Sequence, residues 1–277
     1  METLFLEPYT ILLIAGFIGF FMAFGIGAND VANSMGTSVG SRAITIKQAI
    51  IIAAIFEFLG AFLAGGEVTS TIRKGIVDPE LYVDETNIFV IGMLSALLAG
   101  GTWLYVASLR GWPVSTTHTI VGSIVGFVLI TKGVDAVSWG KVGNIAMSWV
   151  TSPLFSGTLA FGLYISAKKL ILDRSNPGEA AIRYIPFYSF LVAVVISLVT
   201  ARKGLKHVGV EFTDNEVYLF IAIFSSLVGL ATAFFLRRNK QQIMREGGIE
   251  FAFGLLMVVS ASAMAFSHGS NDVANAI

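Results

Sequence analysis

Long apolar stretches are the feature that most restricts the fold of this chain. A helix that crosses the hydrocarbon core of a bilayer needs about 20 mainly apolar residues. Six stretches reach or approach this length and a seventh lies near the end of the chain: residues 10–27, 48–65, 88–109, 154–172, 185–199 with its flanks, 218–236 and 251–267. The first follows Glu2 and Glu7 without a basic segment or a cleavage pattern, so we expect a membrane segment from Thr10 onward and not a cleaved signal peptide. We therefore expect an all-α, polytopic membrane protein in a lipid bilayer.

The composition agrees with this class and excludes others. Hydrophobic residues make up 55% of the chain and charged residues 13%, whereas a soluble domain carries about 25% charge. The formal net charge is +0, so no basic surface for nucleic acid is predicted. The chain has no cysteine, which excludes disulfides and thiolate metal sites. No P-loop, kinase or hydrolase pattern is present, so we expect neither an enzyme nor direct use of ATP.

Two further segments, residues 113–131 and 141–152, fit a spanning helix poorly. The first opens with a run of hydroxyl residues and contains Gly122 and Gly126, and the second is short and ends at Pro153. Short or Gly/Pro-interrupted apolar segments are typical of discontinuous helices in transporters. We expect the two segments to form one re-entrant hairpin.

A repeated motif links the two ends of the chain. Residues 27–33 read GANDVAN and residues 269–275 read GSNDVAN, six of seven positions being identical at an offset of 242. Each copy follows an apolar helix. The motif predicts a bundle with inverted repeats and interrupted helices, an architecture that places the substrate near the middle of the membrane. We divide the chain into residues 1–200 (first repeat and re-entrant hairpin), 201–240 (a connecting transmembrane helix) and 241–277 (the start of a second repeat, expected to continue past Ile277).

The basic residues predict the orientation. The segments 168–184 and 237–250 each hold four Lys or Arg residues and are separated by two spanning helices, so both are expected in the cytoplasm. The segment 78–85 holds four acids and is expected outside, together with the N-terminus. Arg202, Lys203 and Lys206 fall on the outer side and count against this orientation.

The carboxylates of the motif are the first candidate ligands. Asp30 and Asp272 end long apolar segments, where an ionised carboxylate is costly unless it is paired or solvated. An interfacial helix cap is the alternative for a single Asp. Glu57 lies amid apolar residues and is a cation ligand, a proton carrier or a hydrogen-bonded structural residue. Oxygen ligands and unwound backbone suit hard cations. The predicted sodium ligands are Asn29, Asp30, Glu57, Asn271 and Asp272.

The hydroxyl run is the candidate anion site. Ser115, Thr116 and Thr117 follow Pro113 as at the start of a helix, and a helix N-terminus binds anions through free N–H groups. Ordinary capping is the alternative. His118 is ambiguous. The residues predicted to lie at the membrane interface are Glu67, Arg73, Lys74 and Arg110.

These residues resemble the inorganic phosphate transporter (PiT) family. The resemblance rests on residues 27–34, Phe56-Glu57, 71–75 (TIRKG), 113–118 followed by Val121-Gly122, and 269–275. It implies cation-coupled uptake of inorganic phosphate by alternating access through the plasma (inner) membrane, often as a homodimer, with Na⁺ as coupling ion and no organic cofactor. The family's second Pro-x-Ser segment has no counterpart before Ile277.

The resemblance also implies roles for single residues. Asp30, Glu57 and Asp272 would be the coupling carboxylates. The predicted phosphate-binding set is Ser115, Thr116, Thr117, Asn29 and Asn271. A sodium:phosphate symporter is the leading interpretation. A proton-coupled or metal-phosphate carrier, a sulfate or general oxyanion permease, a channel, and a receptor that keeps the fold without transport remain alternatives.

Overall fold

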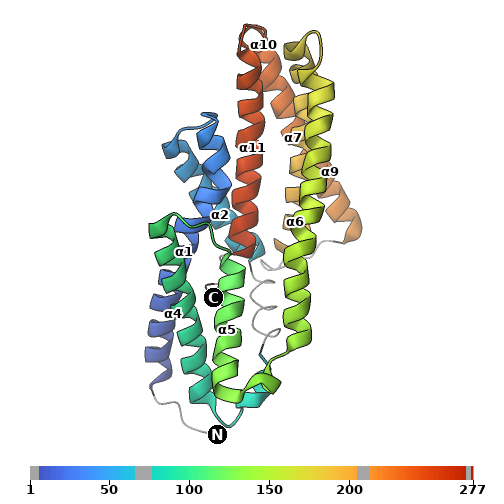
Figure 1. Cartoon of the computed structure of the whole chain (residues 1–277). Helices are drawn as coiled ribbons and strands as arrows, with labels where there is room; N and C mark the ends of the chain where they lie inside the picture. Colours follow the sequence, from blue (N-terminus) through green and yellow to red (C-terminus); the bar gives the residue numbers. More distant parts are fainter. Residues whose placement is uncertain (1–5, 66–76, 205–212, 273–275, 277) are drawn as a thin grey trace.

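The computed structural model describes residues 6–65, 77–204, 213–272 and 276, and every regular element in these ranges is a helix (Figure 1). In chain order these are α1 (Pro8–Gly40), α2 (Ile46–Ala64), η1 (Pro79–Tyr82), α4 (Thr86–Arg110), α5 (Thr116–Lys132), η2 (Val134–Ala136), α6 (Trp139–Ala167), η3 (Lys168–Leu172), α7 (Pro177–Val199), η4 (Thr200–Gly204), α9 (Asp214–Arg238), α10 (Lys240–Ile243) and α11 (Gly248–Asn271).

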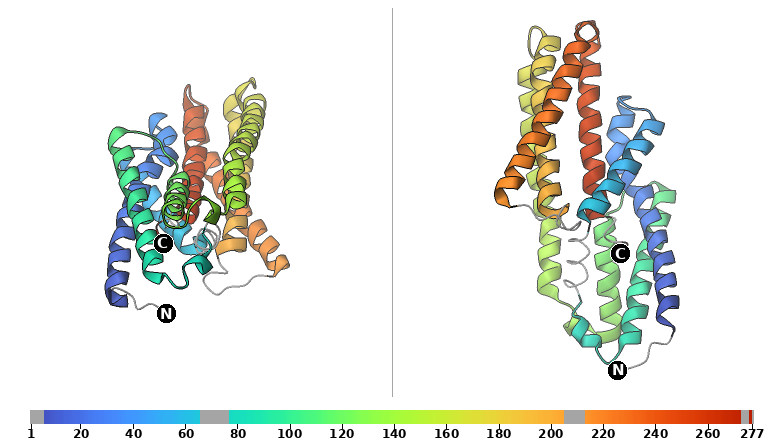
Figure 2. Two further views of the ribbon diagram at one scale, coloured as in Figure 1. Left: turned by 60° about the horizontal axis from the view of Figure 1, so that its bottom comes forward. Right: turned by 180° about the vertical axis from the view of Figure 1, so that it is seen from behind.

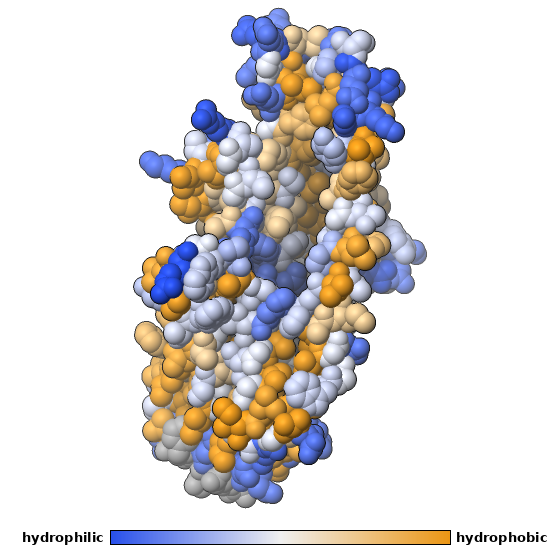
Figure 3. All heavy atoms as spheres, viewed as in Figure 1, coloured by the Kyte–Doolittle hydropathy of each residue, from blue (hydrophilic) through white to orange (hydrophobic). Residues whose placement is uncertain are grey.

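Seven of these helices are long and apolar enough to cross a membrane: α1, α2, α4, α6 with η3, α7 with η4, α9 and α11. Each contains one of the seven apolar stretches found in the sequence, so the prediction of an all-α, multi-pass membrane protein is confirmed. Hydrophobic residues cover much of the face seen in Figure 3, and hydrophilic ones gather at its two ends and around a hollow at mid-height. The bilayer is the solvent that such a surface requires.

Small residues let α1 and α4 approach closely. An added Cβ at Gly25 of α1 would lie 3.1 Å from the Leu104 Cβ, and one at Gly101 of α4 would lie 2.9 Å from the Phe21 ring. Close backbone approach through glycine is the usual packing of helices in membranes. The face of α1 buried by this contact continues through Asn29 and Asp30, because the buried positions recur every three or four residues.

The second close contact joins α2 and α11. A Cβ at Gly269 would overlap the backbone of Glu57, and a Cβ at Gly60 would overlap the backbone at Phe266 and Ser270. The first glycine of the second motif copy is therefore required by the fold. Gly27, its equivalent in the first copy, has no atom within 4 Å of the same position among the described residues.

The prediction that residues 141–152 form a short re-entrant arm is wrong. They are the first part of α6, a continuous helix of 29 residues that contains Pro153. Ser and Thr side chains often satisfy backbone groups around a proline in a membrane helix. Around Pro153 the Thr151 hydroxyl donates to the Met147 carbonyl at 3.2 Å and the Ser156 hydroxyl donates to the Pro153 carbonyl at 3.3 Å, so both bonds go to neighbours of the Trp149 carbonyl, which is the group that lacks the N–H of Pro153. Only the first arm, α5, is short.

The predicted unwinding at the first motif is also wrong, because α1 stays helical from Pro8 to Gly40.

The arrangement of the loops agrees with the predicted sidedness. The link between η3 and α7 and the α10 turn lie at one end of the molecule, while the start of α1 and the link between α4 and η1 lie toward the other end (Figures 1 and 2). The assignment of the first end to the cytoplasm stays a prediction.

The helix α5 begins well inside the molecule. Gly111 follows the last residue of α4 as its C-cap, and its φ of 67° lies in the left-handed region that favours glycine. The chain then turns through Trp112 and Pro113 into α5. With 17 residues, α5 is too short to span a bilayer on its own. Its first turn lies just below the C-terminal end of α11, as both views show (Figures 1 and 2).

Candidate functional site

The site forms where the end of α11 meets the start of α5. Thr116 donates a hydrogen bond from its hydroxyl to Asp272 Oδ1 at 2.8 Å, and Thr117 donates a longer one of 3.4 Å to the same oxygen. Asp272 is the C-terminal cap of α11. One predicted cation ligand is thus bonded directly to two predicted anion ligands. The hydroxyls that were expected to hold the substrate already hold a carboxylate.

Asn29 of the first motif copy holds the chain that leads into α5. Its Nδ2 donates to the Trp112 carbonyl at 3.0 Å, and its Oδ1 accepts a hydrogen bond from the Val114 N–H at 3.3 Å. The side chain is 5% exposed. Both halves of the amide are engaged, so Asn29 positions the start of α5. Its predicted role as a ligand stays a prediction.

Ser115 has a different place from its two neighbours. It is the N-cap of α5, and its hydroxyl oxygen accepts a hydrogen bond from the His118 N–H at 3.2 Å. This is the ordinary capping role that a single Ser at a helix start performs. Its exposed position keeps the hydroxyl proton available. His118 lies against the Trp149 ring, with centroids 3.7 Å apart, and so joins α5 to α6.

Two more carboxylates lie near Asp272. Asp30 is 6% exposed on the buried face of α1, and Glu57 lies on α2 where the backbone of α11 passes. Asp30 and Glu57 both interact electrostatically with Asp272 and with each other. In the described part of the chain, Asp30 Oδ2 and Glu57 Oε1 are buried atoms without a hydrogen-bond partner. A buried polar atom left unpaired costs about 1–3 kcal/mol, so both oxygens favour a ligand.

His268, for which the sequence predicts no role, also lies in this region. It lies one turn before Asp272 on α11 and interacts with it electrostatically. Its Nδ1 is buried and, among the described residues, unpaired. The signal was present in the sequence as the only strongly polar residue of residues 251–268. Three of the four unpaired buried side-chain atoms found in the described ranges belong to this site.

Not every predicted residue joins the cluster. Asn271 is exposed, and its Nδ2 donates back to the Ser267 carbonyl of its own helix at 3.0 Å. No three acidic or histidine side chains of the described residues are close enough together to hold a metal ion. The carboxylates therefore surround the region without converging on one point.

Some predicted residues lie outside the described part of the chain: Glu67, Arg73, Lys74 and the end of the second motif (273–275). Arg110 stacks on the Trp112 ring at 5.4 Å.

The site joins two opposite chemistries. A helix N-terminus with threonine hydroxyls favours an anion, and buried carboxylates with unpaired oxygens favour a cation or a proton. The site therefore offers ligands for ions of both signs in a chain with seven potential membrane spans. A half-length helix that starts inside the molecule, beside the end of a spanning helix, is a feature of secondary transporters.

The chain belongs to the phosphate transporter family, whose model matches residues 26–277. It is 51% identical over 271 residues to a Haemophilus influenzae protein named provisionally as a phosphate permease, covering 95% of this chain and 64% of that one. It is 39% identical over 282 residues to the chloroplastic inorganic phosphate transporter 2-1 of Arabidopsis thaliana, covering 94% and 48%.

A solved structure titled "The sodium-dependent phosphate transporter" is similar in fold. The TM-score is 0.88 at 40% identity, and the match covers 96% of this chain and 65% of that one. The chain thus spans slightly less than two thirds of the length of the Haemophilus protein and of the solved structure, and about half of the length of the Arabidopsis transporter. The family resemblance inferred from the motifs is confirmed, and the family is one of transporters and not of enzymes.

Proposed function

We propose that the chain forms the larger part of a secondary transporter that carries inorganic phosphate across a membrane together with Na⁺. The observation that carries the proposal is the hydrogen bond between Thr116 and Asp272, because it joins the anion-binding end of α5 to the carboxylates. The phosphate-directed names of the relatives and the sodium-dependent title of the similar structure support the choice of both ions.

The same hydrogen bond offers a mechanism of coupling. While Asp272 accepts hydrogen bonds from Thr116 and Thr117, its negative charge lies where a phosphate oxygen would bind. A cation that binds beside Asp272 attracts its carboxylate and weakens its bonds to the hydroxyls. The first turn of α5 is then free for phosphate. Cation binding and phosphate binding stabilise the same arrangement of Asp272, and this is a coupling free energy between two sites.

Phosphate would be held by the hydroxyls of the first turn of α5 and by its free backbone N–H groups. Asn29 would serve this site by fixing the Trp112 to Val114 link. Asn271 stays a candidate ligand, although it bonds its own helix here. We place the protein in the plasma (inner) membrane, and a homodimer in that membrane is part of the proposal.

A proton is the second candidate for the coupling ion. Glu57 Oε1 and His268 Nδ1 are buried and without partners in the described residues, and each could take up a proton. The test is uptake of labelled phosphate into proteoliposomes with the two gradients imposed separately. We expect accumulation above the equilibrium level with an inward Na⁺ gradient at equal pH. Accumulation with a pH gradient alone would assign the coupling to protons, and uptake that only equilibrates would indicate a channel.

A further inference from the structure

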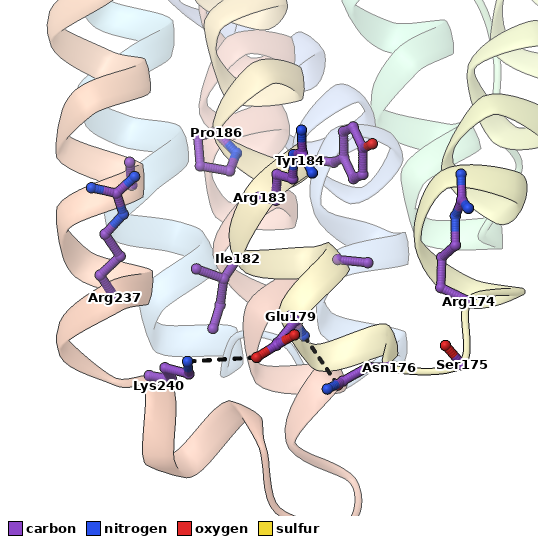
Figure 4. A pocket seen from close by; sticks show the side chains of 12 residues that line it. Arg174, Ser175, Asn176, Glu179, Ile182, Arg183, Tyr184, Pro186, Arg237 and Lys240 are labelled. Carbon is purple, nitrogen blue, oxygen red and sulfur yellow. Dashed lines mark hydrogen bonds and ion pairs between the residues drawn. The ribbon is translucent and has the colours of Figure 1, made fainter.

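A second polar pocket lies between α7 and α9, at the end of the molecule that carries the basic loops (Figure 4). It is lined by the 174–176 link, by the first turns of α7, by the last turns of α9 and by Lys240 of α10. Its volume is about 640 Å³, which is within the usual range of small-molecule sites. It belongs to other helices than the site at Asp272, and neither the carboxylate cluster nor the hydroxyl run contributes to it.

The lining of this pocket is strongly cationic. Arg174, Arg183, Arg237 and Lys240 contribute four positive charges, and Glu179 is the only acidic side chain among the described lining residues, which leaves a formal charge of +3. Glu179 pairs with Lys240 at 3.7 Å. In the described part of the chain, the three arginines form no ion pair. Unpaired guanidinium groups around a cavity favour a phosphate-type anion, which they bind through two parallel hydrogen bonds.

Helix α7 begins at this pocket and adds to its positive potential. Pro177 is the first residue of the helix, and Asn176 caps it by accepting a hydrogen bond from the Glu179 N–H at 3.4 Å. The remaining N–H groups of the first turn carry the positive end of the helix dipole. The arginines on α7 and α9 and the backbone of α7 therefore all raise the positive electrostatic potential of the pocket.

The inner end of the pocket is apolar and closed. Ile182 and Pro186 of α7 and Ala233 of α9 line it. Below them the two helices are in close contact, because a Cβ at Gly229 would lie 3.4 Å from the Pro186 carbonyl oxygen. This contact closes the space between α7 and α9 beyond Pro186. Exposed apolar side chains lie about one or two turns further along the helix faces that carry Arg183 and Arg237, because helical residues three or four apart share a face: Phe187 on α7, and Leu230 and Phe234 on α9.

We propose that this pocket binds the phosphate headgroup of an anionic phospholipid, with the acyl chains along the apolar flank of α7 and α9. Basic pockets between membrane helices bind such headgroups, and each Lys or Arg near the surface contributes about 1 kcal/mol. Inorganic phosphate shares the headgroup's chemistry, but it has no part that would use the apolar flank. The inference does not depend on the proposed transport function.

The experiment measures lipid binding to the purified protein by native mass spectrometry, with phosphatidylglycerol and phosphatidylcholine as probes. We expect saturable binding of phosphatidylglycerol only. The double variant Arg183→Gln/Arg237→Gln should weaken phosphatidylglycerol binding about 25-fold, because the loss of each of the two positive charges weakens it about fivefold. Glu179→Gln should strengthen it, because the only lining carboxylate is neutralised. Arg238→Gln is the matched control, since Arg238 is adjacent to Arg237 in sequence and does not line the pocket.

The outcomes separate the site from general surface charge. An equal loss from Arg238→Gln and Arg237→Gln would show that only the net charge matters, and the site would be wrong. Equal binding of phosphatidylcholine and phosphatidylglycerol would also overturn it. In a parallel titration with inorganic phosphate in lipid-free detergent, binding that depends on Arg183 and Arg237 would assign the pocket to free phosphate and would contradict the lipid proposal.

Discussion

Thr116 and Asp272, 156 positions apart in sequence, are joined by a hydrogen bond of 2.8 Å that places a carboxylate at the start of α5. The bond joins the hydroxyl run, to which Thr116 belongs, to the second copy of the repeated motif, to which Asp272 belongs. A phosphate that binds to the same hydroxyl has to displace this carboxylate. The bond therefore makes the two predicted ion sites interdependent.

Removing the charge of Asp272 should uncouple the two ions. In Asp272→Asn the shape is kept, but the cation loses a charged ligand and the hydroxyls face a neutral group. We expect Na⁺-driven phosphate uptake to fall more than tenfold. We also expect the increase in phosphate affinity on adding Na⁺, about 5- to 150-fold in a coupled pair of sites, to disappear in calorimetric titrations. Asp135→Asn, in the exposed η2 turn, should leave both unchanged. Wild-type coupling in Asp272→Asn would show that the residue is only a helix cap.

The two asparagines of the motif should differ in their effect on stability. Asn29→Leu removes two part-buried hydrogen bonds to the Trp112 and Val114 backbone, each of which contributes about 0.5–1.5 kcal/mol. Asn271→Leu removes one bond within α11 at an exposed position, and should cost much less. Thermal unfolding in detergent measures both. Equal losses of stability in the two variants would contradict the positioning role of Asn29.

The two glycines of the motif should also differ. Gly269→Ala forces a Cβ into the backbone of Glu57, and overpacking of this kind costs about 1–3 kcal/mol or more. Gly27→Ala meets no described atom within 4 Å, and alanine is the better helix former by about 0.5–1 kcal/mol. We expect a lower unfolding temperature for the first variant and an unchanged or higher one for the second. The reverse order would show that α2 and α11 do not meet as described.

Labelling can test the orientation, because the chain has no cysteine. Single cysteines at Asn176 and Gln241 lie at the end with the basic loops, and one at Asp84 lies in the acidic link. With an impermeant thiol reagent on intact cells, we expect labelling of Asp84→Cys alone. The other two should react only after the membrane is opened. Outside labelling of Asn176→Cys or Gln241→Cys would reverse the predicted orientation.

Sulfate tests the chemistry of the anion site. Phosphate near neutral pH retains a P–O–H donor, which sulfate lacks, and the carboxylates of Asp30 and Asp272 are acceptors close to the hydroxyls. A site that requires a hydrogen bond from its substrate rejects an analogue without the donor, because a buried acceptor stays unpaired. We expect a tenfold excess of sulfate to leave labelled phosphate uptake unchanged. Competition at equal concentration would indicate a general oxyanion carrier.

The spans could be predicted from the sequence because the thickness of a bilayer fixes the length of a helix. The continuity of α6 through Pro153 could not be predicted, since a proline can either end an apolar helix or lie within it. The repeated motif singled out Asp272, which the structure places beside the hydroxyl run. It did not reveal that Asn29 is committed to the Trp112 to Val114 link, because that contact joins residues more than 80 positions apart. His268 was overlooked because a single histidine gives no pattern.

The hydrogen bond between Thr116 and Asp272 also bears on the part of a transport cycle in which the carrier returns without cargo. A vacated anion site would leave hydroxyl donors unpaired in the middle of a membrane, and unpaired polar groups there are costly. Asp272 occupies those donors from within the chain. In the proposed cycle, Asp272 would thus replace the phosphate anion while the carrier returns empty. A carrier that holds a cation but no phosphate, with Asp272 withdrawn, would be the species with unsatisfied hydroxyls, and this asymmetry would disfavour a leak of sodium without phosphate.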